Sequence, residues 1–440
     1  MEAARAAGLD VDKLTYEIFS ILESKFLFGY DDPKLFSAGA SPQPAAGTAA
    51  SAKATPLRSP TPPSGNKAKV CILSIDGGGR AADGLLAGAA LVRLEASLRR
   101  RTGDDGARLA DFFDVAAGSG AGGVLAAMLV ARGPHGRPLF SADDALAFLL
   151  SSLRRGGGGG WSDATGGRGG VLRALFRRPG GGGAAFRKVF GDLTLRDTVR
   201  PVLVPCYDLA TGGPFLFSRA DAVETRAYDF RLRDVCAATC ARSSAVEARS
   251  CDGSTRIAAV GGGVALGNPT AAAITHVLNN KREFPLAAGV EDLLVVSIGS
   301  GEGDTRGAAA STSEIVRIAA EGVADMVDQA VAMAFGHNRT SNYIRIQATG
   351  TPRAKGGGCG GVAEEMLAQK NVESVLFRGK KVAEQTNAEK LERFAHELVK
   401  ERDRRRTSPV SPTAVKQQPS TTAPPASYSN LVSHMLTSIM

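Results

Sequence analysis

Lys69-Val-Cys-Ile-Leu-Ser-Ile-Asp-Gly-Gly-Gly-Arg80 and Phe112-Phe-Asp-Val-Ala-Ala-Gly-Ser-Gly-Ala-Gly-Gly123 are the two stretches of this chain that decide its fold. Each opens with a short apolar run rich in β-forming residues and ends in a glycine turn that leads into a helical pattern, over about residues 85–101 and 124–131. Strand, glycine turn and helix, repeated twice, is typical of a parallel α/β sheet. Each turn delivers its backbone N–H groups to a helix N-terminus, where negative charge is stabilised. We therefore expect a functional site between the two turns.

The same alternation continues along the chain. Further strands are predicted over residues 201–207, 214–218, 256–260, 293–298 and 343–347, and further helices over 142–153, 234–242, 268–278, 313–335 and 382–402. The predicted fold class is α/β, with a doubly wound, mainly parallel sheet and helices on both faces.

Composition changes divide the chain into four parts. Residues 1–36 contain an amphipathic helix pattern, residues 37–68 form a flexible linker rich in Ala, Ser, Pro and Gly, and residues 69–402 form the α/β domain. Residues 403–440 are rich in Pro, Ser and Thr and are expected to be a disordered tail. A Gly-rich insertion, 156–183, is interpreted either as a spacer or as part of a mobile, basic, lipid-facing flap. The flap would consist of Arg154-Arg155, Trp161, Leu175, Phe176 and Arg177-Arg178.

Charge and cysteine content narrow the classes of partner and compartment. The net charge is +9. This charge indicates either an anionic partner such as membrane phospholipid, or an Arg-rich surface that only contacts solvent. Nucleic acid is a poor candidate because no aromatic-plus-basic motif accompanies the charge. Six cysteines without disulfide or zinc spacing, no signal peptide and no apolar membrane span predict a cytoplasmic protein with at most peripheral membrane contact. The sequence predicts neither a metal nor a cofactor.

The two glycine turns carry the candidate chemistry. Gly77, Gly78 and Gly79, followed by Arg80, lack the Lys-Ser/Thr of a phosphate loop, so they are interpreted as an oxyanion hole, or as a turn that uses glycine for geometry only. Gly118-Ser119-Gly120-Ala121-Gly122 has the G-x-S-x-G frame of a nucleophile elbow, with Gly120 in the place of the serine. Ser119 stands one position early and is a poor substitute nucleophile.

These motifs together resemble the patatin-like lipid acyl hydrolases. The resemblance covers roughly residues 67–402 and includes three further pieces: Leu109 to Gly118, Cys236 to Ala241 and Gly263-Val-Ala-Leu-Gly-Asn-Pro-Thr270. In that family an elbow Ser and the Asp of a late Asp-Gly-Gly/Ala motif act as a dyad. Here Gly120 falls on the Ser position and Gly261 on the Asp position. The paired loss is similar to the third plant subgroup, in which the elbow Ser is Gly.

The resemblance implies hydrolysis of phospholipid or galactolipid acyl esters, weak or unorthodox because the dyad is absent. The alternative is an inactive pseudoenzyme that binds lipid or protein partners. Residual hydrolysis would need water as nucleophile, with a carboxylate such as Asp76 or Asp114 as base. If the pocket is otherwise intact, Gly120→Ser with Gly261→Asp should restore a dyad. Arg80 departs from the family spacing, which usually places one more residue before the Arg.

Overall fold

The computed structural model describes residues 68–156, 181–242, 244–301, 312–349, 359–375, 379–407 and 413. The predicted amphipathic segment, nearly all of the linker, most of the Gly-rich insertion and nearly all of the tail beyond 407 lie outside the described residues.

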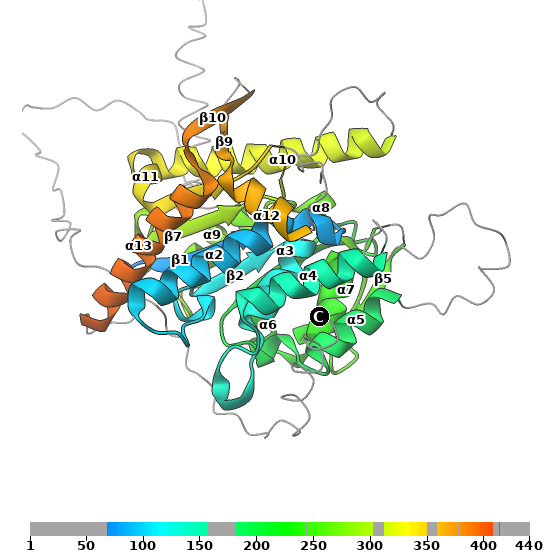
Figure 1. Cartoon of the computed structure of the whole chain (residues 1–440). Helices are drawn as coiled ribbons and strands as arrows, with labels where there is room; N and C mark the ends of the chain where they lie inside the picture. Colours follow the sequence, from blue (N-terminus) through cyan, green and yellow to red (C-terminus); the bar gives the residue numbers. More distant parts are fainter. Residues whose placement is uncertain are drawn as a thin grey trace, which may run out of the picture. The chain divides into compact units, whose positions relative to one another are not determined.

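Within the described residues, an eight-stranded sheet forms the centre of the fold, and its main path runs β5-β6-β3-β2-β1-β7-β8, with β4 paired to β3 (Figure 1). The five strands β3, β2, β1, β7 and β8 are mutually parallel, whereas β4 and β6 run antiparallel to β3. The strands are β1 (Val70–Ile75), β2 (Val115–Gly118), β3 (Val202–Asp208), β4 (Gly213–Ser218), β5 (Val246–Arg249), β6 (Arg256–Gly261), β7 (Leu293–Ile298) and β8 (Tyr343–Ile346). The mainly parallel α/β sheet predicted from the sequence is confirmed.

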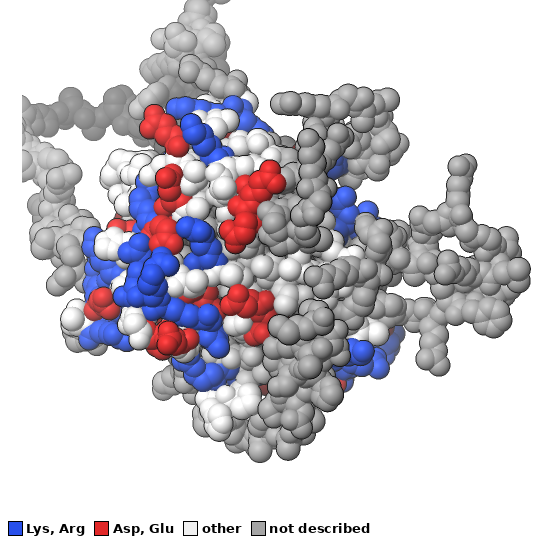
Figure 2. Space-filling model, viewed as in Figure 1, with Lys and Arg blue, Asp and Glu red and all other residues white. Residues whose placement is uncertain are grey.

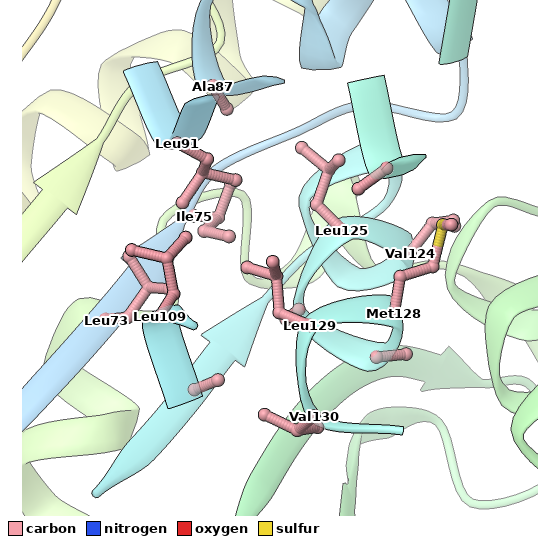
Figure 3. Close-up of a cluster of buried hydrophobic side chains, with 14 of the residues drawn as sticks. Leu73, Ile75, Ala87, Leu91, Leu109, Val124, Leu125, Met128, Leu129 and Val130 are labelled. Carbon is pink, nitrogen blue, oxygen red and sulfur yellow. The ribbon is translucent and has the colours of Figure 1, made fainter. Parts of the chain in front are cut away.

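Helices cover both faces of this sheet, as its alternating side chains require. Cys71, Leu73 and Ile75 of β1 belong to one buried apolar cluster, and Val70 and Ile72 belong to the other. Figure 3 shows part of the first cluster, where side chains of α2 and α3 meet those of β1. The longer helices are α2 (Leu85–Thr102), α3 (Ala121–Val130), α4 (Ala142–Gly156), α5 (Gly181–Phe190), α7 (Leu232–Thr239), α9 (Thr270–Asn279), α10 (Thr312–Phe335), α12 (Cys359–Ala368) and α13 (Asn387–Thr407), and the shorter ones are α6 (Arg219–Glu224), α8 (Gly262–Ala265) and α11 (Arg339–Asn342).

One edge of β3 brings two distant parts of the chain together. Leu203 pairs with Ala117 of β2 on one side and with Ser218 of β4 on the other. Further along, Cys206 pairs with Gly261 of β6, again opposite β4. Strands β2 and β6 therefore lie on the same edge of β3 and run in opposite directions. Their ends are about 7 Å apart, since Gly118, one residue after Ala117, stands two residues along β3 from the partner of Gly261. This arrangement sets Gly118 and Gly261 facing each other.

The C-terminal part of the domain departs from the prediction in two places. The helix predicted over 382–402 begins only at Asn387, because residues 379–386 form strand β10 (Gly379–Thr386), which pairs antiparallel with β9 (Lys370–Val375). The same helix continues to Thr407, beyond the predicted domain end at 402, so residues 403–407 are helical and not part of a disordered tail. A strand rich in Lys, Glu and Gln carries no apolar alternation that the sequence could reveal.

The extension of α13 is held by Arg405. Its guanidinium donates to the Asp114 carboxylate, at 3.0 Å to Oδ1 and 2.7 Å to Oδ2, and pairs with Glu401 at 3.4 Å. Asp114 also accepts the Cys71 N–H at 2.8 Å, and the side chains of Asp114 and Glu401 are both buried. The last helical turn thus ties α13 to the start of the two central strands.

Basic and acidic side chains alternate on the face that α13 and the C-terminal part of α2 share (Figure 2). Arg100 and Arg101 of α2 pair with Glu392 of α13 at 3.0 and 3.3 Å. On this face the arginines of α2 thus share the one carboxylate of Glu392.

We predict that Arg405→Met lowers the free energy of unfolding by about 3–5 kcal/mol, because it leaves the Asp114 carboxylate buried without its charged partner. The matched control is Arg406→Met at the next position. The Arg406 side chain is 68% exposed and lies 4.0 Å from Asp403, which is 60% exposed, so a change below about 1 kcal/mol is expected. Urea unfolding followed by circular dichroism measures both. Equal effects of the two substitutions would show that the Arg405 cluster does not stabilise the domain.

Candidate functional site

The two glycine turns meet at the carboxyl ends of β1 and β2, which are neighbours in the sheet. The Ala121 N–H donates to the Gly78 carbonyl at 2.8 Å, and the Ser119 N–H donates to the Ile75 carbonyl at 3.1 Å. Gly118 ends β2, and Gly122 lies in the first turn of α3. The structure therefore brings the predicted oxyanion turn and the predicted elbow into direct backbone contact.

Gly120 has the backbone conformation of a sharp strand-to-helix turn, with φ 53° and ψ −123°. A Cβ atom added here would lie 2.2 Å from the Gly78 carbonyl oxygen, which is closer than any real contact allows. The Gly120 N–H donates to the Thr239 hydroxyl at 2.9 Å. The place that a side chain at position 120 would occupy is thus filled by backbone of the neighbouring turn.

Gly261 ends β6 on the opposite side of the same site. A Cβ atom added here would lie 2.4 Å from the Ala241 carbonyl oxygen, which already accepts the Gly261 N–H at 2.7 Å. Thr239, from the Cys236-to-Ala241 segment, links this side to the elbow through its bond with Gly120. That segment is one of the pieces that carry the family resemblance, but no sequence pattern assigned a role to Thr239.

The remaining sequence candidates occupy different surroundings. The Ser119 side chain is fully buried, and its hydroxyl finds no hydrogen-bond partner among the described residues, so it does not stand at the apex of the elbow. Arg80 turns its guanidinium to Asp83, with Nε and Nη2 at 3.0 and 2.8 Å from Oδ1. That ion pair closes the first helical turn after the glycines and commits the guanidinium to Asp83.

The N–H groups of Gly77, Gly78 and Gly79 have no acceptor within the part of the chain that the structure describes. Gly77 is buried, and the other two are partly exposed. Three successive N–H groups without acceptors at the end of a strand form a site for a negative or strongly polarised oxygen. The fourth donor expected of such a site, the N–H after the elbow residue, is occupied by Gly78.

A buried ion pair anchors the start of the oxyanion turn. Asp76 Oδ2 accepts from Arg345 Nη2 of β8 at 2.5 Å, and Arg345 Nη1 donates to the Ser297 hydroxyl at 2.7 Å. Burial raises the pKa of Asp76 to about 6, against the opposing effect of Arg345, so the carboxylate is ionised at neutral pH. The pKa of Arg345 is raised by the nearby Asp76 charge, although burial alone would lower the pKa of this guanidinium.

A hydroxyl cluster continues from this ion pair into the late motif. The Thr270 hydroxyl lies 2.9 Å from the hydroxyls of both Ser74 and Ser297, and 2.6 Å from the Asn268 amide oxygen. The Asn-Pro-Thr segment thus fixes the chain after Gly261 to strands β1 and β7. Sequence inspection found Asn268 and Thr270 as motif residues, but no local pattern pointed to Arg345.

The two carboxylates that could act as bases for a water nucleophile, Asp76 and Asp114, are both paired with arginine side chains. Asp76 is committed to Arg345 through Oδ2, whereas its Oδ1 is buried and has no hydrogen-bond partner among the described residues. Asp114 precedes β2, at the end of the strand opposite the elbow, and is bonded to Arg405. Asp114 is therefore not placed to act at the elbow.

No group of three His, Cys, Asp or Glu side chains in the described ranges could hold a metal ion.

Comparison with known proteins places these features in context. A family model described as patatin-like phospholipase matches residues 73–274. "Patatin-like protein 3" of Oryza sativa subsp. indica is 63% identical over 417 residues, covering 91% of this chain and 94% of that protein. "Patatin-like protein 7" of Arabidopsis thaliana is 49% identical over 446 residues, covering 93% and 85%. "Probable inactive patatin-like protein 9" of Arabidopsis thaliana is 39% identical over 410 residues, covering 89% and 93%.

We predict that Gly120→Ala lowers the free energy of unfolding by at least ~3 kcal/mol, because backbone strain adds to a collision with the Gly78 carbonyl. Gly212→Ala is the matched control. Gly212 also has a positive φ, 69°, but an added Cβ would meet nothing within 4 Å, so only a strain of about 1 kcal/mol is expected. Chemical denaturation measures the difference, and equal losses would mean that the two turns separate easily.

The same contacts change the expectation for a restored dyad. Gly120→Ser with Gly261→Asp would add two side chains at positions already filled by carbonyl groups. We therefore predict that the double variant is less stable than the parent and hydrolyses short-chain esters no faster, as measured with purified protein shown to be folded. A folded double variant that is ~10²-fold faster would show that the turns open to accept a dyad.

Proposed function

The chain belongs to the patatin-like family, and we propose that it is a slow lipid acyl hydrolase that acts on the acyl esters of phospholipids or galactolipids. The observation that supports this most directly is the row of N–H groups at Gly77, Gly78 and Gly79, for which the described residues supply no acceptor. An ester carbonyl oxygen that accepts from these donors would gain negative charge during attack, and the donors would stabilise it.

The missing side chains set the expected rate. Loss of a nucleophile and its base typically costs ~10⁶ in rate and leaves about 10³ over the uncatalysed reaction from the oxyanion hole and binding. Water is then the nucleophile, and the chain's own contribution is to bind and polarise the ester carbonyl. Asp76 acts as a positioning residue, because its ion pair with Arg345 fixes the start of the turn.

A second candidate function is lipid binding without turnover. The close contacts at Gly120 and Gly261 favour it, since both dyad positions are filled by backbone. The relative named as a probable inactive protein fits the same interpretation. Both candidates predict binding of lipid acyl esters, and they differ only in the release of fatty acid.

Membrane lipid is the partner we propose in either case, with peripheral contact by a cytoplasmic protein. Among the described helices, none is both long and apolar enough to cross a bilayer. The basic flap predicted for 156–183 falls almost wholly outside the described residues, so its contact with anionic lipid stays a prediction.

We predict that Gly79→Pro lowers fatty-acid release from phospholipid vesicles by ~10²–10³, because proline removes one of the three donors. Gly79→Ala is the matched control, since it keeps the N–H. Its Cβ would lie 2.3 Å from Cγ of Arg242 and 2.9 Å from the Cys240 carbonyl oxygen, so the Arg242 side chain and the Cys240 backbone must both move, and each variant is first shown to be folded by circular dichroism. Both variants share these contacts. Fatty-acid release by the alanine variant should stay within a few-fold of release by the parent.

The same preparations decide between the two functions. Release equal to that of heat-inactivated protein, with vesicle binding retained, would favour binding without turnover. Fatty-acid release that is identical in the parent and in both variants would show that the glycine turn does not contribute to hydrolysis. Absence of both release and binding would contradict both functions.

A further inference from the structure

Helix α10 has apolar residues on both of its long sides. One side packs on the sheet and buries Val331, Ala332 and Phe335. The other side is exposed, with Ile315 at 55%, Met326 at 66% and Met333 at 64%. Figure 1 shows α10 (yellow) at the margin of the described domain in that view. An exposed apolar helix face of this length usually marks a contact with another molecule.

The exposed residues form one continuous stripe along the helix. They follow each other at intervals of three or four residues, which places them on one face: Ile315, Ala319, Gly322, Met326, Ala330 and Met333. The stripe spans about 27 Å, at 1.5 Å per residue. It contains no charged residue, and a Cβ added at Gly322 would meet nothing within 4 Å.

The order of large and small residues along this stripe is self-complementary. When two copies of the helix lie antiparallel with their centres at residue 324, Ile315 lies level with Met333 and Gly322 with Met326, while Ala319 lies close to Ala330. Small residues let the two backbones approach, and each Met326 side chain covers the Gly322 of the other copy. A two-fold axis requires this kind of self-complementary surface.

The exposed area of the stripe also fits an interface between two copies of this chain. With Val316, Ile318 and Val323 beside it, the stripe exposes on the order of 600 Å², the upper end of what a monomer normally shows. Two such patches bury about 1,200 Å² together, the lower end for a specific interface.

We propose that α10 is the interface of a homodimer in which two copies pack antiparallel along this stripe. This proposal goes beyond the lipid-directed function and does not depend on it. A membrane is the weaker occupant, because acidic side chains flank the stripe. Glu321 pairs with Arg317 at 2.5 Å and Asp325 pairs with Lys380 at 3.1 Å, so the nearby cations are already engaged, and anionic lipid would gain little.

Sedimentation equilibrium of the full chain at micromolar concentrations tests the proposal. The parent should be a dimer, and Met326→Glu should raise the dimer dissociation constant at least ~100-fold, since it puts two like charges near each other across the axis. Leu209→Glu is the matched control: Leu209 is 53% exposed but lies in the β3–β4 loop, so this variant should dimerise like the parent.

Charge complementation tests the antiparallel register. Ala319→Lys and Ala330→Glu should each weaken the dimer, whereas an equimolar mixture should form a heterodimer because the two positions face each other. Circular dichroism confirms that each variant is folded. A parent that stays monomeric at ~100 μM, far above the range of specific complexes, would overturn the proposal. Dimerisation unaffected by Met326→Glu would also overturn it. So would a monomeric parent whose binding to phosphatidylcholine vesicles is lost with Met326→Glu, because the stripe would then be a membrane contact.

Discussion

The close approach of two backbone turns is the constraint on which the rest of this site depends. Parallel pairing of β1 with β2 sets the turn after Ile75 beside the turn after Gly118, near enough for the Gly78 carbonyl to accept the Ala121 N–H at 2.8 Å. Such an approach leaves no space for a Cβ atom, so glycine at 120 is a packing requirement of the present backbone. The absence of a side chain at position 120 and the closeness of the two turns are therefore one structural fact.

The same constraint separates two properties that a hydrolase normally combines. The N–H groups of Gly77, Gly78 and Gly79 have no acceptor among the described residues, whereas the places of side chains at 120 and 261 are both filled by carbonyl groups. Polarisation of an ester carbonyl needs only the donors, whereas covalent catalysis needs side chains that reach it. The buried pair of Asp76 and Arg345 holds the donors in place, although a buried ion pair of this kind specifies geometry more than it adds stability. Capacity to bind a polarised oxygen can thus persist without a dyad.

Local patterns in the sequence predicted the sheet and its glycine turns, because apolar runs and glycine clusters are properties of adjacent residues. The assignment of Gly120 and Gly261 to one dyad site comes from the family resemblance and stays a prediction. Local patterns could not predict Arg345, whose partner Asp76 is 269 residues away, or the contact between Gly120 and Thr239, because such pairs follow from tertiary packing. Strand β10 and the end of α13 were missed for a related reason. Lys380 to Gln385 has no strand periodicity, and Arg404 to Arg406 resembles a solvated charge run until Arg405 is seen to reach Asp114.

The residues that carry the family resemblance are mostly those that build the sheet. Thr270 of the Asn-Pro-Thr segment bonds to Ser74 and Ser297 and so joins α9 to two strands, and Cys236 packs in the same apolar cluster as Leu73. Selection for this packing would preserve such residues whether or not an ester is cleaved, because burial and hydrogen bonding stabilise the domain in either case. High identity to patatin-like relatives therefore reports the scaffold and the position of the donor turn. Where the two turns meet, and at the end of β6, carbonyl groups occupy the places that side chains at 120 and 261 would take.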